Sequence, residues 1–325
     1  MLGEKQTEAI NQEAAWPTLS LLIPFFNEER QIETTLQTVM PIMDSLNLSY
    51  EIVCVDDGSS DNSWQLLSQY AQTYPQIYAL RFSRNFGKEA ALSAGLAEVR
   101  GEAVITMDGD LQHDPGHIPQ MVELWREGYD VVEGVKSARK DGVFSRFAAN
   151  TFYKVFKLAS GYNLKNASDF KLLDRKVIDA WNQLPEKETF YRALSVWLGY
   201  RRTSFTFEVQ ERKNGQSKWS LFKLMRLSGN ALTAFSSKPL QIIKIIGWIF
   251  IVFFLALTVQ TSVNYFQGHA VEGFTTVILL QLLTGGGIFL GLGVIGSYID
   301  RIYTEVKQRP RYLISERKGR NEDDR

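Results

Sequence analysis

Two long apolar stretches toward the C-terminal end constrain this chain more than any other feature of its sequence. Residues 240–263 carry a single charge, Lys244, and residues 274–299 carry none. A helix of about 20 residues crosses the hydrocarbon core of a bilayer, so each stretch is long enough to span it. Because apolar runs of this length are rare in the cores of soluble proteins, we expect two transmembrane helices.

The average composition hides these segments. The chain has a mean hydropathy of −0.16, with 45% hydrophobic and 22% charged residues, which argues against a disordered chain and against a polytopic transporter. The 36 basic and 36 acidic residues give a net charge of zero, so no global field attracts nucleic acid and we expect no such partner. A lone Cys54 cannot form an internal disulfide.

Basic residues flank the two stretches on one side of the predicted membrane. The connecting residues 264–273 contain no Lys or Arg. The flanking basic residues are Lys238, Lys244, Arg301, Lys307, Arg309 and Arg311. By the positive-inside rule, and because the N-terminal end lacks a signal-peptide pattern, we expect a multi-pass protein of the cell membrane with its large N-terminal domain and both termini in the cytoplasm. The glycine-rich second stretch would also allow helix packing and a homo-oligomer.

The first half of the chain alternates short apolar runs with amphipathic stretches. This alternation predicts an α/β fold with a doubly wound, mostly parallel sheet, whose ligands bind at the carboxyl ends of its strands. The predicted strands are 19–26, 50–57, 77–82, 102–108 and 129–135, and the predicted helices are 29–46, 61–74, 88–99 and 117–127.

Carboxylates follow three of the predicted strands, and no glycine fingerprint of a dinucleotide site accompanies them, which argues against a dehydrogenase. Asp108 and Asp110 flank a glycine that allows a tight turn, so both can face one ion. An acidic pocket can hold a diphosphate only through a divalent cation. Asp56 or Asp57 is suited to accept a hydrogen bond from a ribose hydroxyl or a base edge. Each motif alone could be a surface turn or a helix cap, but their coincidence in one sheet favours a nucleotide-diphosphate site with a metal ion.

Four motifs in a fixed order carry a family resemblance. IPFFNEE (23–29), VDDGSSD (55–61), RFSRNFGKEAAL (81–92) and MDGDLQHDP (107–115), followed by the two apolar stretches, resemble the family 2 glycosyltransferases that act on polyprenyl phosphates. The bactoprenol glucosyltransferases, which are related to the dolichyl-phosphate mannosyltransferases, are the most similar group. The resemblance extends over nearly the whole chain. It implies a GT-A fold and an inverting, metal-dependent transfer of a hexose, glucose from UDP-glucose, to a membrane polyprenyl phosphate.

The resemblance also implies roles for particular residues. Mg²⁺ or Mn²⁺ would be held by Asp108, Asp110 and Gln112, and Asp169 is similar to an acidic residue near the sugar that orients the acceptor, positions the sugar or acts as a base. The nucleotide-sugar donor would be contacted by Pro24, Glu28, Asp57, Lys88 and Asp108. The acceptor phosphate would be contacted by Arg139, Arg212, Ser217 and Lys218. Where many relatives have two arginines, this chain has Lys136 and Arg139.

The chemistry expected at such a site needs cations more than a base. A phosphate monoester is already ionised at pH 7, so a strong general base is not required to activate it. Arginine matches phosphate geometry best. Arg201, Arg202 and Lys213 are further candidates to hold the acceptor, with membrane topology or contact with anionic lipids as the alternative explanation of the basic cluster.

Two segments with apolar stripes edged by basic residues are typical of helices in the lipid interface, around 144–159 and within 216–237, although packing on the sheet would give the same stripes. We therefore expect a flexible extension over 1–16, a GT-A catalytic domain over 17–215, an interfacial helix over 216–237, two membrane helices within 238–300 and a cytoplasmic tail over 301–325.

Three alternatives compete with this hypothesis. The same reaction could use another donor: GDP-mannose, UDP-N-acetylglucosamine or a UDP-aminosugar. A processive polysaccharide synthase is disfavoured because the chain lacks a Q-x-x-R-W motif and further spans. A membrane-anchored sensor of nucleotide-sugars without catalysis is disfavoured because Asp108, Asp110 and Gln112, the residues that would hold a leaving-group metal, are intact.

Overall fold

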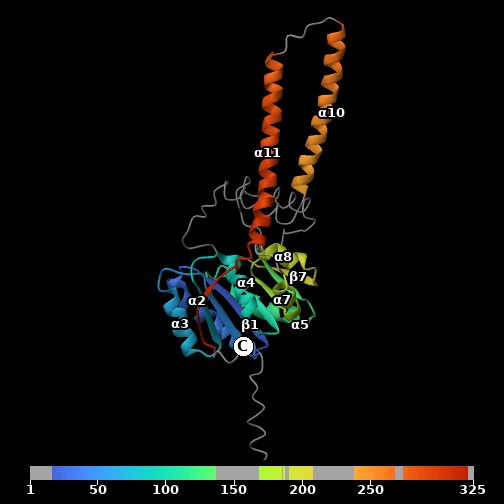
Figure 1. Cartoon of the computed structure of the whole chain (residues 1–325). Helices are drawn as coiled ribbons and strands as arrows, with labels where there is room; N and C mark the ends of the chain where they lie inside the picture. The colour runs from blue at the N-terminus through green and yellow to red at the C-terminus, as the bar shows by residue number, and fades with distance from the viewer. Residues whose placement is uncertain are drawn as a thin grey trace, which may run out of the picture. The chain divides into compact units, whose positions relative to one another are not determined.

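A computed structural model of the chain describes residues 17–136, 168–184, 186, 190–207, 238–267 and 274–320 (Figure 1). These residues belong to two compact units. The first unit contains the sheet, its helices and the residues from Pro310 onward, and the second contains two long helices that end before that point. The predicted extension over 1–16 and both predicted interfacial helices lie outside the described residues.

The first unit is built on an eight-stranded sheet with the strand order β7-β5-β6-β4-β1-β2-β3-β8. The strands β1 to β5, which are the first five along the chain, confirm the five predicted strands. Six of the eight strands run in one direction, which agrees with the predicted mostly parallel sheet, whereas β6 and β8 run antiparallel to their neighbours and make the sheet mixed. The strands are β1 (Leu19–Phe25), β2 (Tyr50–Asp56), β3 (Ile77–Phe82), β4 (Ala103–Thr106), β5 (Val131–Lys136), β6 (Lys171–Asp174), β7 (Arg202–Phe207) and β8 (Ile314–Lys318).

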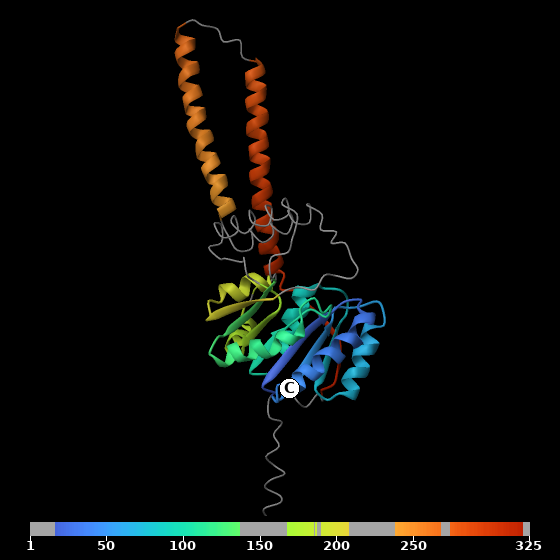
Figure 2. The same ribbon diagram turned by 180° about the vertical axis from the view of Figure 1, so that it is seen from behind.

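Helices cover both faces of this sheet (Figures 1 and 2). The side chains of β1 alternate between them: Leu21 and Ile23 belong to the core under α2, α3 and α5, whereas Leu22 faces α4. A methyl group at Gly95 of α4 would lie 2.0 Å from the Leu22 side chain, so this glycine lets helix and sheet approach closely. The helices are α2 (Glu29–Ser45), α3 (Ser63–Thr73), α4 (Lys88–Glu98), α5 (Ile118–Arg126), α7 (Arg175–Asn182) and α8 (Tyr191–Trp197).

The second unit contains α10 (Lys238–Phe266) and α11 (Phe274–Val306). Among the residues that the structure describes, one helical stretch, Leu283–Val306, is long and apolar enough to cross a membrane by length and composition. The apolar stretch Ile245–Leu257 of α10 is shorter. The second predicted span is thus supported, and the first stays a prediction.

The segment after α11 is part of the first unit, so residues 310–320 of the expected tail over 301–325 are folded onto the sheet and are not a free tail. Strand β8 pairs with β3 at the edge of the sheet, and the ring of Tyr312 stacks on Phe82 at 5.1 Å. Glu316 accepts hydrogen bonds from Trp64 Nε1 at 3.1 Å and from Arg81 at 3.0 Å. The charged, half-exposed sequence of this strand hid it, because its backbone pairing and not an apolar pattern holds it in place.

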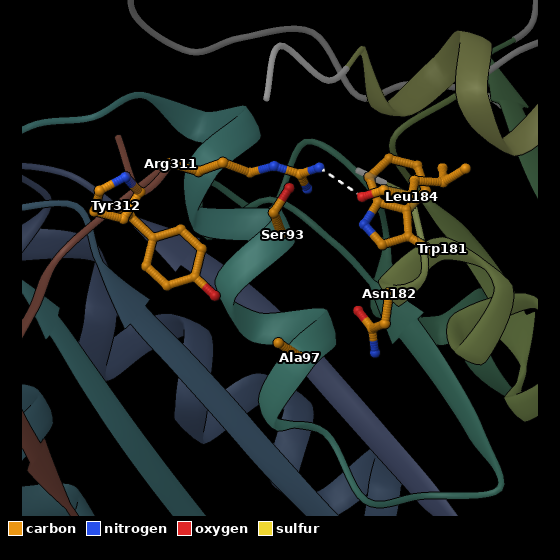
Figure 3. Close-up of a pocket in the computed structure, with 8 residues that line it drawn as sticks. Ser93, Ala97, Trp181, Asn182, Leu184, Arg311 and Tyr312 are labelled. Carbon is orange, nitrogen blue, oxygen red and sulfur yellow. Dashed lines mark hydrogen bonds between the residues drawn. The ribbon is translucent and has the colours of Figure 1, made fainter. Parts of the chain in front are cut away.

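Just before β8, the chain runs past helices α4 and α7. Arg311 donates a hydrogen bond to the carbonyl of Leu184 at 2.9 Å (Figure 3). A hollow of about 600 Å³ separates this segment from α4 and α7 and is bordered by Ser93, Trp181 and Tyr312 among others. The C-terminal segment therefore contacts both the β3 edge and the α7 side of the first unit.

A substitution in β8 tests this arrangement. Glu316→Ala would leave Trp64 Nε1 and Arg81 without their carboxylate, and we expect it to lower the free energy of unfolding by about 1 kcal/mol, since the carboxylate is partly exposed. Glu316→Gln keeps an acceptor for the indole N–H and should cost less. Denaturant unfolding of the purified protein measures both. An unchanged midpoint for Glu316→Ala would show that the side-chain bonds of Glu316 add nothing to the stability of the sheet.

Candidate active site

The carboxyl ends of β1, β2 and β4 lie at one edge of the sheet. The register pairs Phe25 with Asp56 and Leu22 with Thr106, so the three loops that follow these strands converge. These loops carry the acidic motifs predicted from the sequence. The expectation that the strand-end carboxylates gather at one edge is therefore confirmed for the parallel centre of the sheet.

Side chains join the first two loops to each other. The backbone N–H of Asn27 donates to Ser59 Oγ at 2.9 Å, and its side-chain Oδ1 accepts the backbone N–H of Ser60 at 2.8 Å. Asn27 adopts a φ of 53°, a conformation that asparagine tolerates better than most residues. The N–H of Glu28 donates to Ser63 Oγ at 3.0 Å. This turn fixes where the Glu28 side chain begins.

Asp57 secures a third loop, the one between β3 and α4. Its carboxylate accepts the N–H of Phe86 at 2.7 Å and that of Gly87 at 2.9 Å, and its residue is 3% exposed. Gly87 has a φ of +97°, which favours glycine. Asp57 thus holds the start of α4 in place at the end of β2, the strand in which Val55 pairs with the half-buried Pro24 of β1. Asp61 acts as a local cap, because its Oδ1 accepts the N–H of Ser63 at 3.0 Å.

The loop after β4 contains Asp108, Gly109 and Asp110. A Cβ at Gly109 would lie 2.4 Å from the ring of Phe25 and 3.1 Å from Glu28 Oε2, so only glycine allows this loop to pack on the end of β1. Asp110 accepts hydrogen bonds from the backbone N–H of Gln112 at 3.1 Å and from its side-chain amide. The glycine therefore brings the loop carboxylates and Glu28 together.

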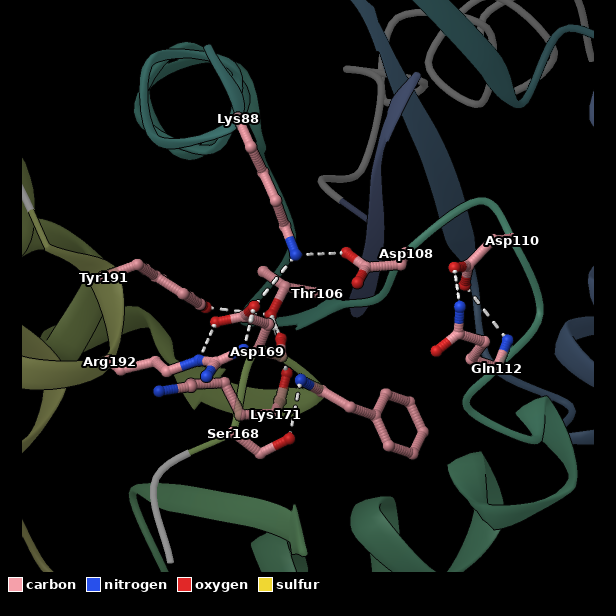
Figure 4. Close-up of polar contacts among 11 residues, drawn as sticks. Lys88, Thr106, Asp108, Asp110, Gln112, Ser168, Asp169, Lys171, Tyr191 and Arg192 are labelled. Carbon is pink, nitrogen blue, oxygen red and sulfur yellow. Dashed lines mark hydrogen bonds and ion pairs between the residues drawn. The ribbon is translucent and has the colours of Figure 1, made fainter. Parts of the chain in front are cut away.

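Lys88, the first residue of α4, lies between two carboxylates (Figure 4). Its Nζ is 2.5 Å from Asp108 Oδ1 and 2.9 Å from Asp169 Oδ2. Asp169 precedes β6, and Arg192 at the start of α8 contacts both of its carboxylate oxygens, with Nε at 2.8 Å and the second nitrogen at 2.7 Å. The predicted donor residue Lys88 and the predicted sugar residue Asp169 thus lie together.

Glu28 carries the clearest electrostatic perturbation of this group. Burial, and then the charges of Asp110 and Asp108, raise the pKa of its carboxyl to about 7. Its Oε2 is buried and, in the part of the chain that the structure describes, has no hydrogen-bond partner. Three carboxylates close together with one lysine are short of positive charge, so a further cation would be stabilised here.

The residues fit a hard divalent cation by donor chemistry. Asp108, Asp110 and Gln112 offer carboxylate and amide oxygens, which Mg²⁺ and Mn²⁺ prefer, and the unpaired Glu28 oxygen lies against the same loop. Over the described ranges no three His, Cys, Asp or Glu side chains form a ready-made ligand cluster. The side chain of Gln112 donates a hydrogen bond to Asp110 through its amide nitrogen.

The predicted acceptor residues are not placed together with this group. Arg139, Arg212, Ser217 and Lys218 lie outside the described residues, as does Lys213. Arg201 directly precedes β7, and Arg202 is its first residue. Because β7 runs parallel to β5, both arginines lie at the amino ends of the strands, opposite the carboxyl ends that carry the acidic loops. Arg202 pairs with Glu133 at 2.7 Å, and Arg201 stacks over Tyr129. The hypothesis that these two arginines hold the acceptor is wrong.

Sequence reasoning missed three residues of the site. Arg192 contacts Asp169 directly, and the hydroxyls of Thr106 and Tyr191 meet at 2.9 Å below it. None of them belongs to a motif. Thr106 ends an ordinary buried strand, and Tyr191 and Arg192 open a short helix, so only the tertiary fold brings them to Asp169.

Comparison with known proteins extends over most of the chain. A model described as "Glycosyl transferase family 2" matches residues 20–181. An uncharacterized glycosyltransferase from Synechocystis sp. is 39% identical over 92% of this chain and 95% of its own length. The bactoprenol glucosyl transferase of Shigella phage SfX is 37% identical over 92% of this chain and 99% of its own length. Among solved structures, mannosyl-3-phosphoglycerate synthase from Rubrobacter xylanophilus covers 73% of this chain and 76% of that chain, with 16% identity and a TM-score of 0.49.

Proposed function

The chain belongs to glycosyltransferase family 2, and from that premise we propose that it transfers glucose from UDP-glucose to the phosphate of a membrane polyprenyl phosphate, with inversion at the anomeric carbon. The observation that carries the proposal is the group of Glu28, Lys88, Asp108, Asp110 and Asp169 at the carboxyl edge of a GT-A-like mixed sheet. Relatives named bactoprenol glucosyl transferase, at 35–37% identity over nearly their whole length, support the lipid acceptor and the sugar.

Donor binding follows from the charges of this group. Asp108, Asp110 and Gln112 would hold Mg²⁺ or Mn²⁺, which when bound stabilises the leaving diphosphate as a Lewis acid. Lys88 begins α4, and the amino end of a helix together with an ammonium group favours a phosphate. Pro24 and Asp57 flank the place where the nucleotide would lie, at the neighbouring ends of β1 and β2.

The acceptor needs positioning more than activation. A phosphate monoester carries its negative charge at pH 7, so it can attack the anomeric carbon without giving up a proton to the protein. A single displacement inverts that carbon. Arg139, Arg212, Ser217 and Lys218 are proposed to hold the acceptor phosphate, because charge-assisted bonds from arginine fit phosphate oxygens.

The acceptor lipid places the reaction at a bilayer. We propose that α10 and α11 both span the membrane, that the catalytic domain of 17–215 and both termini are cytoplasmic, and that residues 216–237 form an interfacial helix. The apolar composition of both helices and the basic residues outside them support this topology. The glycines of α11 suit packing against another helix, which supports a homo-oligomer.

A donor panel tests the proposal. The purified protein is incubated with polyprenyl phosphate, Mg²⁺ or Mn²⁺, and labelled UDP-glucose, GDP-mannose, UDP-N-acetylglucosamine or a UDP-aminosugar in turn, and lipid-linked label is measured after organic extraction. We expect UDP-glucose to be the best donor. Chelation with EDTA should lower the rate by at least about 10²-fold, and either metal should restore it. Lipid-linked sugar from none of the donors would contradict the proposal.

A further inference from the structure

Asp169 is held by more positive charge than any other carboxylate of the site. Its Oδ1 accepts from Arg192 Nε, and its Oδ2 accepts from both Arg192 and Lys88 (Figure 4). The Asp169 side chain is 12% exposed, whereas those of its partners Arg192 and Lys88 are 44% and 39% exposed. Burial would raise the pKa of this carboxyl, but the hydrogen bonds and charges of Arg192 and Lys88 outweigh burial and keep the pKa well below its usual range.

Buried hydrogen bonds fix the backbone of both Asp169 and Arg192. Thr106 Oγ1 donates to the carbonyl of Asp169 at 2.6 Å and meets the hydroxyl of Tyr191 at 2.9 Å. Tyr191 is fully buried and directly precedes Arg192. Its backbone N–H donates a hydrogen bond to the Glu89 carboxylate at 2.7 Å. The start of α8 is therefore tied to β4 and to the residue before β6. Neither partner of the pair can shift without disturbing buried contacts.

Although Arg192 is partly exposed, the geometry of this contact differs from that of an ordinary surface ion pair. Exposed pairs between single charges contribute little, because water screens them and both side chains remain mobile. Here the planar guanidinium meets the carboxylate through two parallel bonds, which fixes its plane as well as its distance. A lysine at the same position could supply the charge but not this geometry.

We propose that Arg192 is a positioning residue for the sugar transfer: its two-bond contact sets the plane of the Asp169 carboxylate, and Asp169 in turn holds the Lys88 ammonium beside Asp108. The inference rests on the proposed function. It assigns Asp169 to orientation and not to proton transfer, since a carboxylate engaged by three cationic N–H groups is a poor base. Through Lys88, Arg192 acts on the same place where the donor diphosphate would lie.

Steady-state kinetics of three variants test this role. Because misplacement by about 1 Å can cost about 10²-fold, we expect Arg192→Gln to lower kcat by about 10- to 10²-fold. The KM values for donor and acceptor should change by less than about 3-fold, since a residue that acts through Asp169 is expected to contact neither substrate. Arg192→Lys should recover only part of kcat. Arg126→Gln, which removes an exposed arginine at the end of α5, is the matched control and should leave kcat unchanged.

A double variant separates positioning from a structural role. Once Asp169→Asn has removed the carboxylate, Arg192→Gln should cost little more, whereas independent effects would multiply. Unaltered kcat in Arg192→Gln, an effect on acceptor KM alone, or fully multiplicative losses would each overturn the inference. If Arg192→Gln fails to fold, as judged by thermal unfolding, Arg192→Lys provides the same comparison. A wild-type protein inactive with every donor would instead refute the proposed function, and with it this inference.

Discussion

Asp110→Asn is expected to lower the rate of sugar transfer by about 10²–10³-fold, because each interaction that stabilises a leaving group contributes about that factor in a water-excluded site. Asp110 and Asp108 are the charged oxygens of the loop after β4. An asparagine is nearly the same size and can still accept the N–H of Gln112, so the loop should keep its shape. The loss would then report on the missing charge.

Asp114→Asn is the matched control for this variant. It removes the same charge four residues further along, in the same loop region, where the carboxylate accepts the N–H of Gly116 at 2.8 Å. Asparagine caps a helix as well as aspartate does, so the fold and the rate should change by less than about twofold. Initial rates of lipid-linked sugar formation measure both variants. If Asp110→Asn keeps more than a tenth of the wild-type rate, the role assigned to this carboxylate is wrong.

Lys171→Met is expected to give the largest loss of stability. Lys171 is fully buried in β6, with its Nζ 2.6 Å from Ser195 Oγ and 3.2 Å from the buried carboxylate of Glu133. Burial lowers the pKa of this lysine, although the charge of Glu133 opposes that effect. Removing one partner of a buried pair typically costs about 3–5 kcal/mol, and we expect about 3 kcal/mol because Arg202 still contacts Glu133.

The double variant Lys171→Met with Glu133→Gln tests whether the loss of stability comes from breaking the ion pair or from the changed volume of the side chain. Replacing both charges avoids leaving one of them buried alone, so most of the stability should return. Chemical denaturation followed by circular dichroism gives the free energies. Lys171→Met alone costing less than about 1 kcal/mol, or the double variant being no better than the single one, would contradict this account of the pair.

The alternating half of the sheet could be predicted because its signals are local. β1 to β5 are short apolar runs, and the helices between them have apolar faces, so each element is visible within its own residues. β6 and β8 depend on partners far along the chain: Glu316 of β8 bonds Trp64, 252 residues away. The polar sequence of β8 and the shortness of β6 give no sign of which neighbour each strand will join, so the two antiparallel strands could not be predicted.

The candidate site followed the same division. Asp108, Asp110, Glu28 and Lys88 belong to motifs at strand ends, and the parallel register of β1, β2 and β4 brings those ends together. Arg192 lies in a helix that packs on the site only in the folded protein. Arg201 and Arg202 show the converse error, since a basic pair close to the other motifs in sequence lies at the opposite edge of the sheet.

The balance of donor consumption against lipid product tests the central claim most directly. The purified protein is supplied with UDP-glucose and Mg²⁺ or Mn²⁺, with and without polyprenyl phosphate, and released UDP and lipid-linked glucose are measured together. We predict that UDP appears only when the lipid phosphate is present, in equal amount to a lipid-linked monosaccharide with an inverted anomeric carbon. UDP release without lipid-linked sugar, or the formation of a glucose polymer, would contradict transfer to a lipid phosphate.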